Sequence, residues 1–239
     1  MVQDGRRTLL DQAALLSIIL VATVMTWSIV TSRVASRPAR RDGTPKNEFV
    51  PSAPIAIGNI VGPRPERAQI AILEFTDFQC PFCGRFAQDV LPSIRTRYLA
   101  SGRVVMAIGH LPLDAIHPAA RTAAQAAECA QRQGHFWDMH DRLFADQRRL
   151  GSAVIESAAQ SLGLDMTVFL RCLGDESSTK LASDATLAES LQVNATPTFF
   201  FGTLGADGRL TVKRRVSGML RLDTVDRILE PLIESTKGS

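Results

Sequence analysis

Two cysteines separated by two residues are the feature of this sequence whose spacing is suited to chemistry. Cys80 and Cys83 follow directly after Ile70–Phe75, an apolar run that predicts a buried strand. Apolar residues then recur every four positions, which predicts a helix. The N-terminus of a helix presents unpaired N–H groups and a partial positive charge, and both stabilise a thiolate on the first cysteine. The second cysteine, one turn later, is placed to attack a mixed disulfide formed by the first.

The other two cysteines, Cys129 and Cys172, are far apart in the sequence. A Cys-x-x-Cys pair normally stays paired within itself, so Cys129 and Cys172 are left as a second pair. An even number of cysteines fits an oxidising compartment. The alternative is two unrelated, buried free thiols, and the spacing leaves both interpretations open.

Half of a zinc site is the main alternative for the Cys-x-x-Cys motif. A four-ligand zinc site needs a second cysteine or histidine pair at short spacing. Cys129 and Cys172 are single cysteines in predicted helices, and His135 and His140 are not matched to them. We therefore expect no metal and no other cofactor.

The length and composition of the chain are those of one substantial domain with additional segments. Of 239 residues, 45% are apolar and 21% are charged, and the formal net charge is only +3. Aromatic residues are few and are not interleaved with basic ones, so nothing indicates nucleic-acid binding.

An uncharged stretch at residues 12–32 predicts a transmembrane signal anchor after a short cytoplasmic N-terminus, residues 1–11. At about 1.5 Å per residue, it is just long enough to cross a bilayer core of about 30 Å. The alternative is a cleaved signal peptide that ends near Val34-Ala35-Ser36 and releases a secreted or periplasmic protein. Residues 33–65 are rich in proline and arginine and predict an extended tether.

The charges around this stretch conflict with disulfide chemistry. The basic residues that follow it would place the remainder of the chain in the cytoplasm by the positive-inside rule. A cytoplasmic disulfide would be hard to keep oxidised. We therefore expect a single-pass protein of the cell membrane with its catalytic domain outside the cytoplasm.

The order of predicted elements indicates an α/β domain at residues 66–114 and 192–234, interrupted by a helical insertion at 115–191. The first strand, the helix after Cys83 and a second strand at 103–110 form a parallel unit, whose ligand site lies at the carboxyl ends of the strands. The remaining predicted elements are helices at 119–133, 136–147, 152–162, 166–172 and 177–191, strands at 198–201 and 210–216, and a helix at 222–233.

Two further residues qualify for the site. Pro197 stands directly before the strand at 198–201, where a cis bond after Thr196 would turn the backbone towards the cysteines and expose it to an extended peptide. An ordinary proline at the start of a strand is the alternative. Glu74 lies on an otherwise apolar strand, where a buried carboxylate with a raised pKa could take the proton of the second cysteine. A glutamate that faces solvent is the alternative for that position.

Three stretches of the chain together resemble the DsbA-like thiol:disulfide oxidoreductases of the thioredoxin superfamily. They are Leu73-Glu74-Phe75-Thr76-Asp77-Phe78-Gln79-Cys80-Pro81-Phe82-Cys83, Gly134-His135-Phe136-Trp137-Asp138-Met139-His140-Asp141 and Val193-Asn194-Ala195-Thr196-Pro197-Thr198-Phe199. The first is similar to the active-site region of that family, the second to its insert helix, and the third to its cis-proline segment.

The resemblance implies a thioredoxin-like fold with an inserted helical subdomain, and it assigns roles to the site. Cys80 would be the nucleophile, Cys83 the resolving cysteine and Glu74 the proton relay. Pro197 would be the cis-proline, and we expect Thr196, Pro81 and Phe82 to contact substrate. Cys129 and Cys172 resemble a structural pair found in some members.

Phe82 is the one departure from the family pattern that affects chemistry. The strongest oxidants of the family carry Pro-His between the cysteines, and phenylalanine neither donates a hydrogen bond nor carries charge. We therefore expect a milder oxidant, because stabilisation of the thiolate sets the redox potential.

The function expected from sequence is the oxidation of cysteines in exported proteins, with re-oxidation by a membrane-bound, quinone-linked partner, as the resemblance implies. One alternative is a disulfide reductase or isomerase that uses the same residues. A second alternative, from a different class, is a redox-inert chaperone that binds peptides at Thr196-Pro197.

Overall fold

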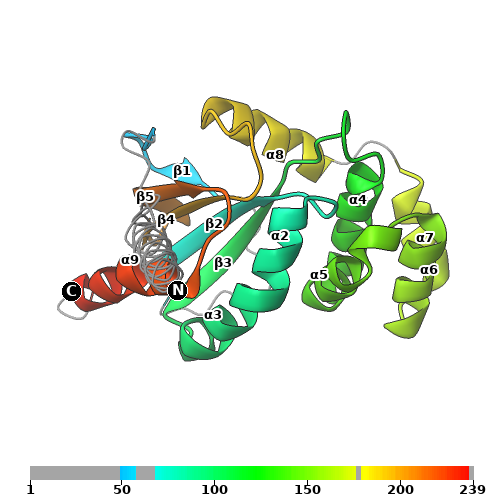
Figure 1. The fold of residues 1–239 in the computed structure, drawn as a ribbon, viewed down its shortest axis with the longest axis horizontal. Helices are drawn as coiled ribbons and strands as arrows, with labels where there is room; N and C mark the ends of the chain where they lie inside the picture. Colours follow the sequence, from blue (N-terminus) through cyan, green and yellow to red (C-terminus); the bar gives the residue numbers. More distant parts are fainter. Residues whose placement is uncertain (1–48, 58–67, 176–178, 237–239) are drawn as a thin grey trace, which may run out of the picture. The chain divides into compact units, whose positions relative to one another are not determined.

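A computed structural model describes residues 49–57, 68–175 and 179–236 (Figure 1). In this part of the chain, five strands form one sheet in the order β1-β5-β4-β2-β3. β2 and β3 are parallel, and the β2–β4, β4–β5 and β5–β1 pairs are antiparallel. The strands are β1 (Ile55–Ala56), β2 (Ile70–Thr76), β3 (Val104–His110), β4 (Thr198–Leu204) and β5 (Arg209–Ser217).

The two parallel strands are buried along their whole length. Every residue of β2 and of β3 is shielded from solvent, as expected for nearly continuous apolar sequences covered on both faces. Thr76 and His110 are paired at the carboxyl ends of these strands. The sequence-based prediction of a parallel strand pair is confirmed, and both strands end at the edge of the sheet where the cysteines lie.

The helix after the first cysteine is built in three pieces. α2 (Pro81–Arg85) leads into a π-helical turn (Phe86–Val90) and then α3 (Leu91–Arg97), followed by a short 3₁₀ turn (Leu99–Ser101). Pro92 lies in the first turn of α3, where a proline needs no hydrogen bond from its nitrogen. A new helix therefore starts at this proline, and the first helix begins at Pro81, before the second cysteine.

Helices cover both faces of the sheet. Apolar residues of α3 and of α9 (Leu222–Ser235) share one core with residues of β2 and β4 such as Ile72 and Phe199. On the opposite face, Ala188 of α8 (Thr179–Ser190) packs in a second core with Leu73 and Phe200. The first core is the larger, because it continues into the helices that follow β3.

The insertion between β3 and β4 divides into two parts. α4 (Ala120–Gln131), α5 (Phe136–Ala145), α6 (Ser152–Ser161) and α7 (Met166–Leu173) pack against one another, and Figure 1 shows them grouped beside the sheet. A 3₁₀ turn (Gln147–Arg149) follows α5. α8, which the sequence-based prediction included in the insertion at 115–191, instead lies on the sheet, since burial of its apolar residues completes the second core.

The predicted transmembrane anchor at residues 12–32 and most of the predicted tether at 33–65 lie outside the described residues. Among the residues that are described, no helix is long and apolar enough to cross a bilayer.

Candidate active site

The end of β2 places Cys80 at the start of α2. The chain leaves the sheet at Thr76, turns through Asp77, and reaches Cys80 with an extended backbone, φ −67° and ψ 121°. Pro81 then opens the helix, a position where its fixed φ suits helical geometry and its missing N–H costs nothing. Cys83 follows within the first turn and is fully buried. Both cysteines are free thiols.

Asp77 holds this turn through a set of contacts that the sequence did not reveal. Its buried carboxylate accepts N–H bonds from Gln79 (2.7 Å) and Cys80 (3.2 Å) through Oδ1. Its other oxygen, Oδ2, accepts the N–H of Leu113 (2.8 Å) and lies 2.8 Å from Nδ1 of His117. One carboxylate therefore joins the cysteine loop to the loop that follows β3. The available signal in the sequence was an acidic residue four positions before the first residue of the helix, Pro81.

The peptide bond between Thr196 and Pro197 is cis, and it faces Cys80. The Cys80 thiol donates to the carbonyl oxygen of Thr196 at 3.3 Å, across 116 residues of sequence. The buried Thr196 hydroxyl has no hydrogen-bond partner, so it is available to donate once the thiol has ionised. Gly218 donates its N–H to the Pro197 carbonyl (2.8 Å), which anchors the segment to the end of β5. The predicted cis bond is thus present and next to the first cysteine.

The two thiols have opposite acidities. The pKa of Cys80 is lowered to about 5 because Cys83 donates a hydrogen bond to its thiolate, and Thr196 and the N–H groups of Cys83 and Phe82 add to this against the cost of partial burial. The pKa of Cys83 is raised, first by burial, then by its hydrogen bond to Cys80 and the negative charge of Glu74. At neutral pH, Cys80 is therefore the thiolate of the pair, which is the form that reacts.

Glu74 is completely buried on the same strand as Thr76. Burial raises the pKa of its carboxyl to about 8, and the neighbouring Cys80 thiolate adds to this rise. Glu74 Oε2 and the Thr76 hydroxyl are both buried without a hydrogen-bond partner. A solvent-facing glutamate is thus excluded, and the carboxyl can exchange a proton near neutral pH.

The residues between the cysteines are accessible from solvent. Phe82 is 48% exposed, and Pro81 is exposed beside it. The guanidinium of Arg85, one turn later, lies over the Phe82 ring at 4.9 Å from its centroid. Phe82 therefore presents an apolar surface and a nearby positive charge next to Cys80.

Gln147, in the 3₁₀ turn after α5, holds the cysteine loop from the side of the insertion. Its amide nitrogen donates to the carbonyl oxygens of Phe78 and Cys80, both at 2.8 Å. Its amide oxygen lies so close to Gly84 that a Cβ on residue 84 would collide with it. No local pattern in the sequence marks Gln147, because the contact depends on how the insertion folds back onto α2.

The two histidines near the site have different surroundings. His117 contacts the carboxylate of Asp77, and the same carboxylate accepts the N–H of Cys80. His110 is fully buried, its Nε2 lies 2.9 Å from Glu128 of α4, and its ring lies beside Phe78. Within the described residues, no group of three or more His, Cys, Asp or Glu side chains is placed to hold a metal ion.

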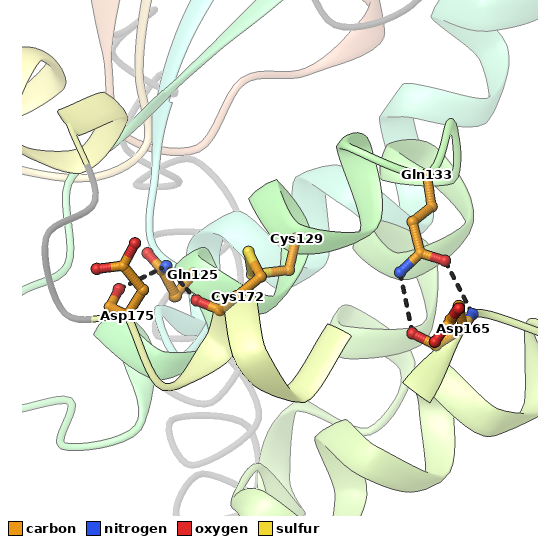
Figure 2. Close-up of a disulfide and its surroundings, with 6 residues drawn as sticks. All are labelled: Gln125, Cys129, Gln133, Asp165, Cys172 and Asp175. Carbon is orange, nitrogen blue, oxygen red and sulfur yellow. Dashed lines mark hydrogen bonds between the residues drawn. A yellow bond between two sulfur atoms is a disulfide. The ribbon is translucent and has the colours of Figure 1, made fainter. Parts of the chain in front are cut away.

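Cys129 and Cys172 form a disulfide that joins α4 to α7 (Figure 2). The side-chain amides of two glutamines, Gln125 and Gln133, lie on either side of this disulfide (Figure 2). Gln125 donates to the carbonyl oxygens of Cys172 and Asp175, both at 3.1 Å. The Gln133 amide oxygen accepts the N–H of Asp165 (2.8 Å), and its nitrogen donates to the Asp165 carbonyl oxygen (3.3 Å). Of the two interpretations left open by the sequence, the structure shows the bonded pair.

Comparison with known proteins places the chain in a family. A family model described as Thioredoxin matches residues 57–215, and the chain belongs to this family. Among solved structures, the fold is similar to that of Wolbachia pipientis alpha-DsbA1, with a TM-score of 0.62 and 22% identity over 71% of this chain and 88% of that one. It is also similar to oxidised BdbD from Bacillus subtilis, with a TM-score of 0.63 and 20% identity over 79% of this chain and 100% of that one. The chain thus has the thioredoxin-like fold of DsbA-like thiol-disulfide oxidoreductases.

A curated relative carries a different name. The Na(+)/H(+) antiporter NhaA 3 of Salinispora tropica is 36% identical over 193 residues, which are 76% of this chain and 29% of the antiporter. The chain therefore spans less than a third of that relative's length. A match of 193 residues must run mostly through residues 57–215, because the rest of the chain is much shorter, so the relative contains a segment similar to this thioredoxin domain.

Proposed function

We propose that this chain is a membrane-anchored, extracytoplasmic thiol:disulfide oxidoreductase that forms disulfides in exported proteins through Cys80-Pro81-Phe82-Cys83. The observation that carries the proposal is the opposite acidity of the two thiols, with the pKa of Cys80 lowered to about 5 and that of buried Cys83 raised. Thiol-disulfide exchange needs one stable thiolate that leaves readily and one partner thiol that is protected from outside attack.

In the oxidising direction, the reaction begins with a Cys80–Cys83 disulfide. A substrate thiolate attacks Sγ of Cys80, the Cys80–Cys83 bond breaks, and Cys83 leaves with the electron pair and takes a proton from Glu74. A second substrate thiolate then attacks the substrate sulfur of the mixed disulfide and releases the Cys80 thiolate, which Thr196 and the helix N–H groups stabilise. The substrate loses two electrons, and a quinone-linked membrane protein takes them from the cysteine pair to restore its disulfide.

The cis-proline segment supports a role in substrate binding. The Thr196 carbonyl is already within hydrogen-bonding distance of Cys80, so an extended peptide with its cysteine at Cys80 would run along this backbone. Pro81 and Phe82 offer exposed apolar surface on the other side of the thiol. Together these groups would hold the substrate cysteine in line with the Cys80 sulfur.

The direction of exchange is proposed from the compartment. The Cys129–Cys172 disulfide fits an oxidising environment, as does the uncharged stretch at residues 12–32 if it anchors the domain outside the cytoplasm. Phe82 favours the alternative, a reductase or isomerase, because its side chain gives the Cys80 thiolate no hydrogen bond. Measurement of the reduction potential of the Cys80–Cys83 pair therefore distinguishes an oxidase from a reductase or isomerase.

The decisive measurement is the reduction potential of the Cys80–Cys83 pair, together with its redox state in cells by alkylation trapping. A potential towards about −120 mV and an oxidised pair in cells would support oxidation, whereas a potential near −270 mV and a reduced pair would support reduction. For the topology, alkaline phosphatase fused to the C-terminus should be active, and external thiol reagents should label the domain. An inactive fusion together with failed labelling would overturn the extracytoplasmic placement.

A further inference from the structure

A cleft of about 910 Å³ lies beside the cysteine loop. One wall is formed by α2 and the turn that follows it, with Pro81, Arg85 and Gln88. The other wall is the end of α5 and the 3₁₀ turn 147–149, and His117 and Gln79 close the cleft near Asp77. The proposed function uses the loop itself and leaves this cleft unassigned.

The charge of the cleft is positive. Arg85, Arg148 and Arg149 line it, against the single carboxylate of Asp146 among the described lining residues. Asp146 forms an ion pair with Arg149. Neither Arg85 nor Arg148 has an acidic partner in the part of the chain that the structure describes, and both are exposed. Two cations therefore remain for a ligand that enters from solvent.

The hydrogen-bonding groups of the cleft suit a peptide better than a simple anion. Gln88 donates its amide nitrogen to the carbonyl oxygen of Phe144 (2.8 Å), and Gln147 donates to the backbone of the cysteine loop. Both N–H groups of the Gln147 amide and one of the two of Gln88 are thus occupied, which leaves the Gln88 side chain with an acceptor oxygen and one N–H group among the lining residues. Amide oxygens accept from the N–H groups of an extended backbone, whereas they repel a bare phosphate or carboxylate.

The cleft also has the right position and length. Pro81 is adjacent to Cys80, and the helical run from Pro81 to Gln88 extends about 10 Å. An extended peptide of about three residues covers that distance. A substrate that has its cysteine at Cys80 would therefore place the residues next to that cysteine along Arg85 and across from Arg148.

We propose that this cleft binds acidic residues flanking the reactive cysteine of a protein substrate, with Arg85 and Arg148 as the residues that determine specificity. The proposal rests on disulfide exchange at Cys80 and names a substrate class for it. The cationic pair attracts the acidic side chains, and the amide of Gln88 pairs with the peptide backbone.

The test compares stopped-flow rates of disulfide exchange between the oxidised full chain, in non-ionic detergent, and three dithiol peptides. The peptides differ only in the residues that flank their cysteines, which are glutamate, glutamine or lysine. The readout is the ratio of the glutamate to the glutamine rate, in which any shared effect on Cys80 cancels. Exposed ion pairs are individually weak, so we expect a ratio of about three to ten at low ionic strength, falling towards one as salt is added.

Charge reversal identifies the residues. The double variant R85E/R148E should lower the glutamate-to-glutamine ratio below one and favour the lysine peptide. The matched control is R142E/R171E, which makes the same change in net charge at two exposed arginines outside the cleft and should keep the wild-type ratio.

Each other outcome has a distinct meaning. Equal rates for all three peptides, or the same drop in ratio for both double variants, would overturn the cleft proposal and leave exchange at Cys80 intact. No exchange with any peptide would overturn the proposed function itself. If glutathione disulfide, a small anionic substrate, responded to R85E/R148E while the peptide ratio did not, a small-molecule site would replace the peptide site.

Discussion

Cys80 and Cys83 lie three residues apart at the start of a helix, whereas Cys129 and Cys172 lie 43 residues apart and join two helices. The first pair has a thiolate held by N–H groups and a hydroxyl, a buried carboxyl within reach, and an accessible loop. The second pair is buried between packed helices, and the amides of Gln125 and Gln133 hold backbone groups on either side of it. Both pairs use the same side chain, and the surroundings assign one to exchange and the other to cross-linking.

Removal of the first thiol should produce the largest effect. Cys80→Ser should lower peptide disulfide exchange by at least about a thousandfold, because no other accessible thiolate replaces it. Cys83→Ser should instead accumulate a mixed disulfide between Cys80 and the substrate, visible on a non-reducing gel. Exchange that survived in Cys80→Ser would show that another cysteine, Cys83 or one of the second pair, can act as the nucleophile.

Removal of the second pair should affect stability and spare the chemistry. In the chain-entropy treatment, a disulfide that closes a loop of 43 residues contributes about 3–4 kcal/mol, so C129A/C172A should lower the free energy of unfolding by about that amount in urea titrations. C80A/C83A is the matched control, which loses two sulfur atoms but no cross-link relative to the native protein with Cys80 and Cys83 in the thiol form shown by the structure. Equal stabilities for the two double variants would contradict the comparison.

Replacement of the buried carboxyl should slow exchange and change its pH dependence. Glu74→Gln removes the group that gives Cys83 its proton, so exchange near pH 7 should slow by about a hundredfold. Cys80, whose pKa is lowered from 9.0 to about 5, contributes a gain in stability as the pH rises. Glu74 contributes a loss between 4.5 and about 8, because over that range the folded state keeps its proton and the unfolded state does not. Glu74→Gln should not show this loss.

Urea titrations at pH 5 and pH 8 measure that difference. Glu189→Gln, at an exposed position on α8, serves as the control and should follow the native protein. If the change in stability between the two pH values were the same for Glu74→Gln as for the native protein, the raised pKa of Glu74 would be wrong.

The smallest expected effect is the adjustment of the redox potential by the residue between the cysteines. Phe82→His supplies a hydrogen-bond donor and charge near the Cys80 thiolate, so the reduction potential should rise by tens of millivolts, where about 30 mV corresponds to 1.4 kcal/mol. Phe82→Leu removes the ring without adding a donor and should change the potential little. An unchanged or lower potential for Phe82→His in a glutathione titration would contradict the role given to this position.

Much of the fold and of the reacting groups could be predicted from the sequence, because they follow from local patterns. The apolar run before the cysteines, the helix after them and the proline before β4 each carry a signal within a few residues. The periodicity of α8 gave no sign that it covers the sheet, since a helix has the same apolar spacing whichever neighbour buries it. The contacts of Asp77 with His117 and of Gln147 with Cys80 depend on tertiary packing, and the arginine-lined cleft does so as well.

The anchoring of the cysteine loop has a consequence for how such a protein can change over evolutionary time. The loop is held by Asp77 and Gln147, through N–H and carbonyl groups of the backbone, and none of these bonds involves the side chains of Pro81 or Phe82. Substitution of Phe82 therefore leaves every one of these hydrogen bonds in place. The redox potential proposed to depend on the dipeptide between the cysteines and the shape of the loop are determined at separate positions, so selection can alter the first while leaving the second intact.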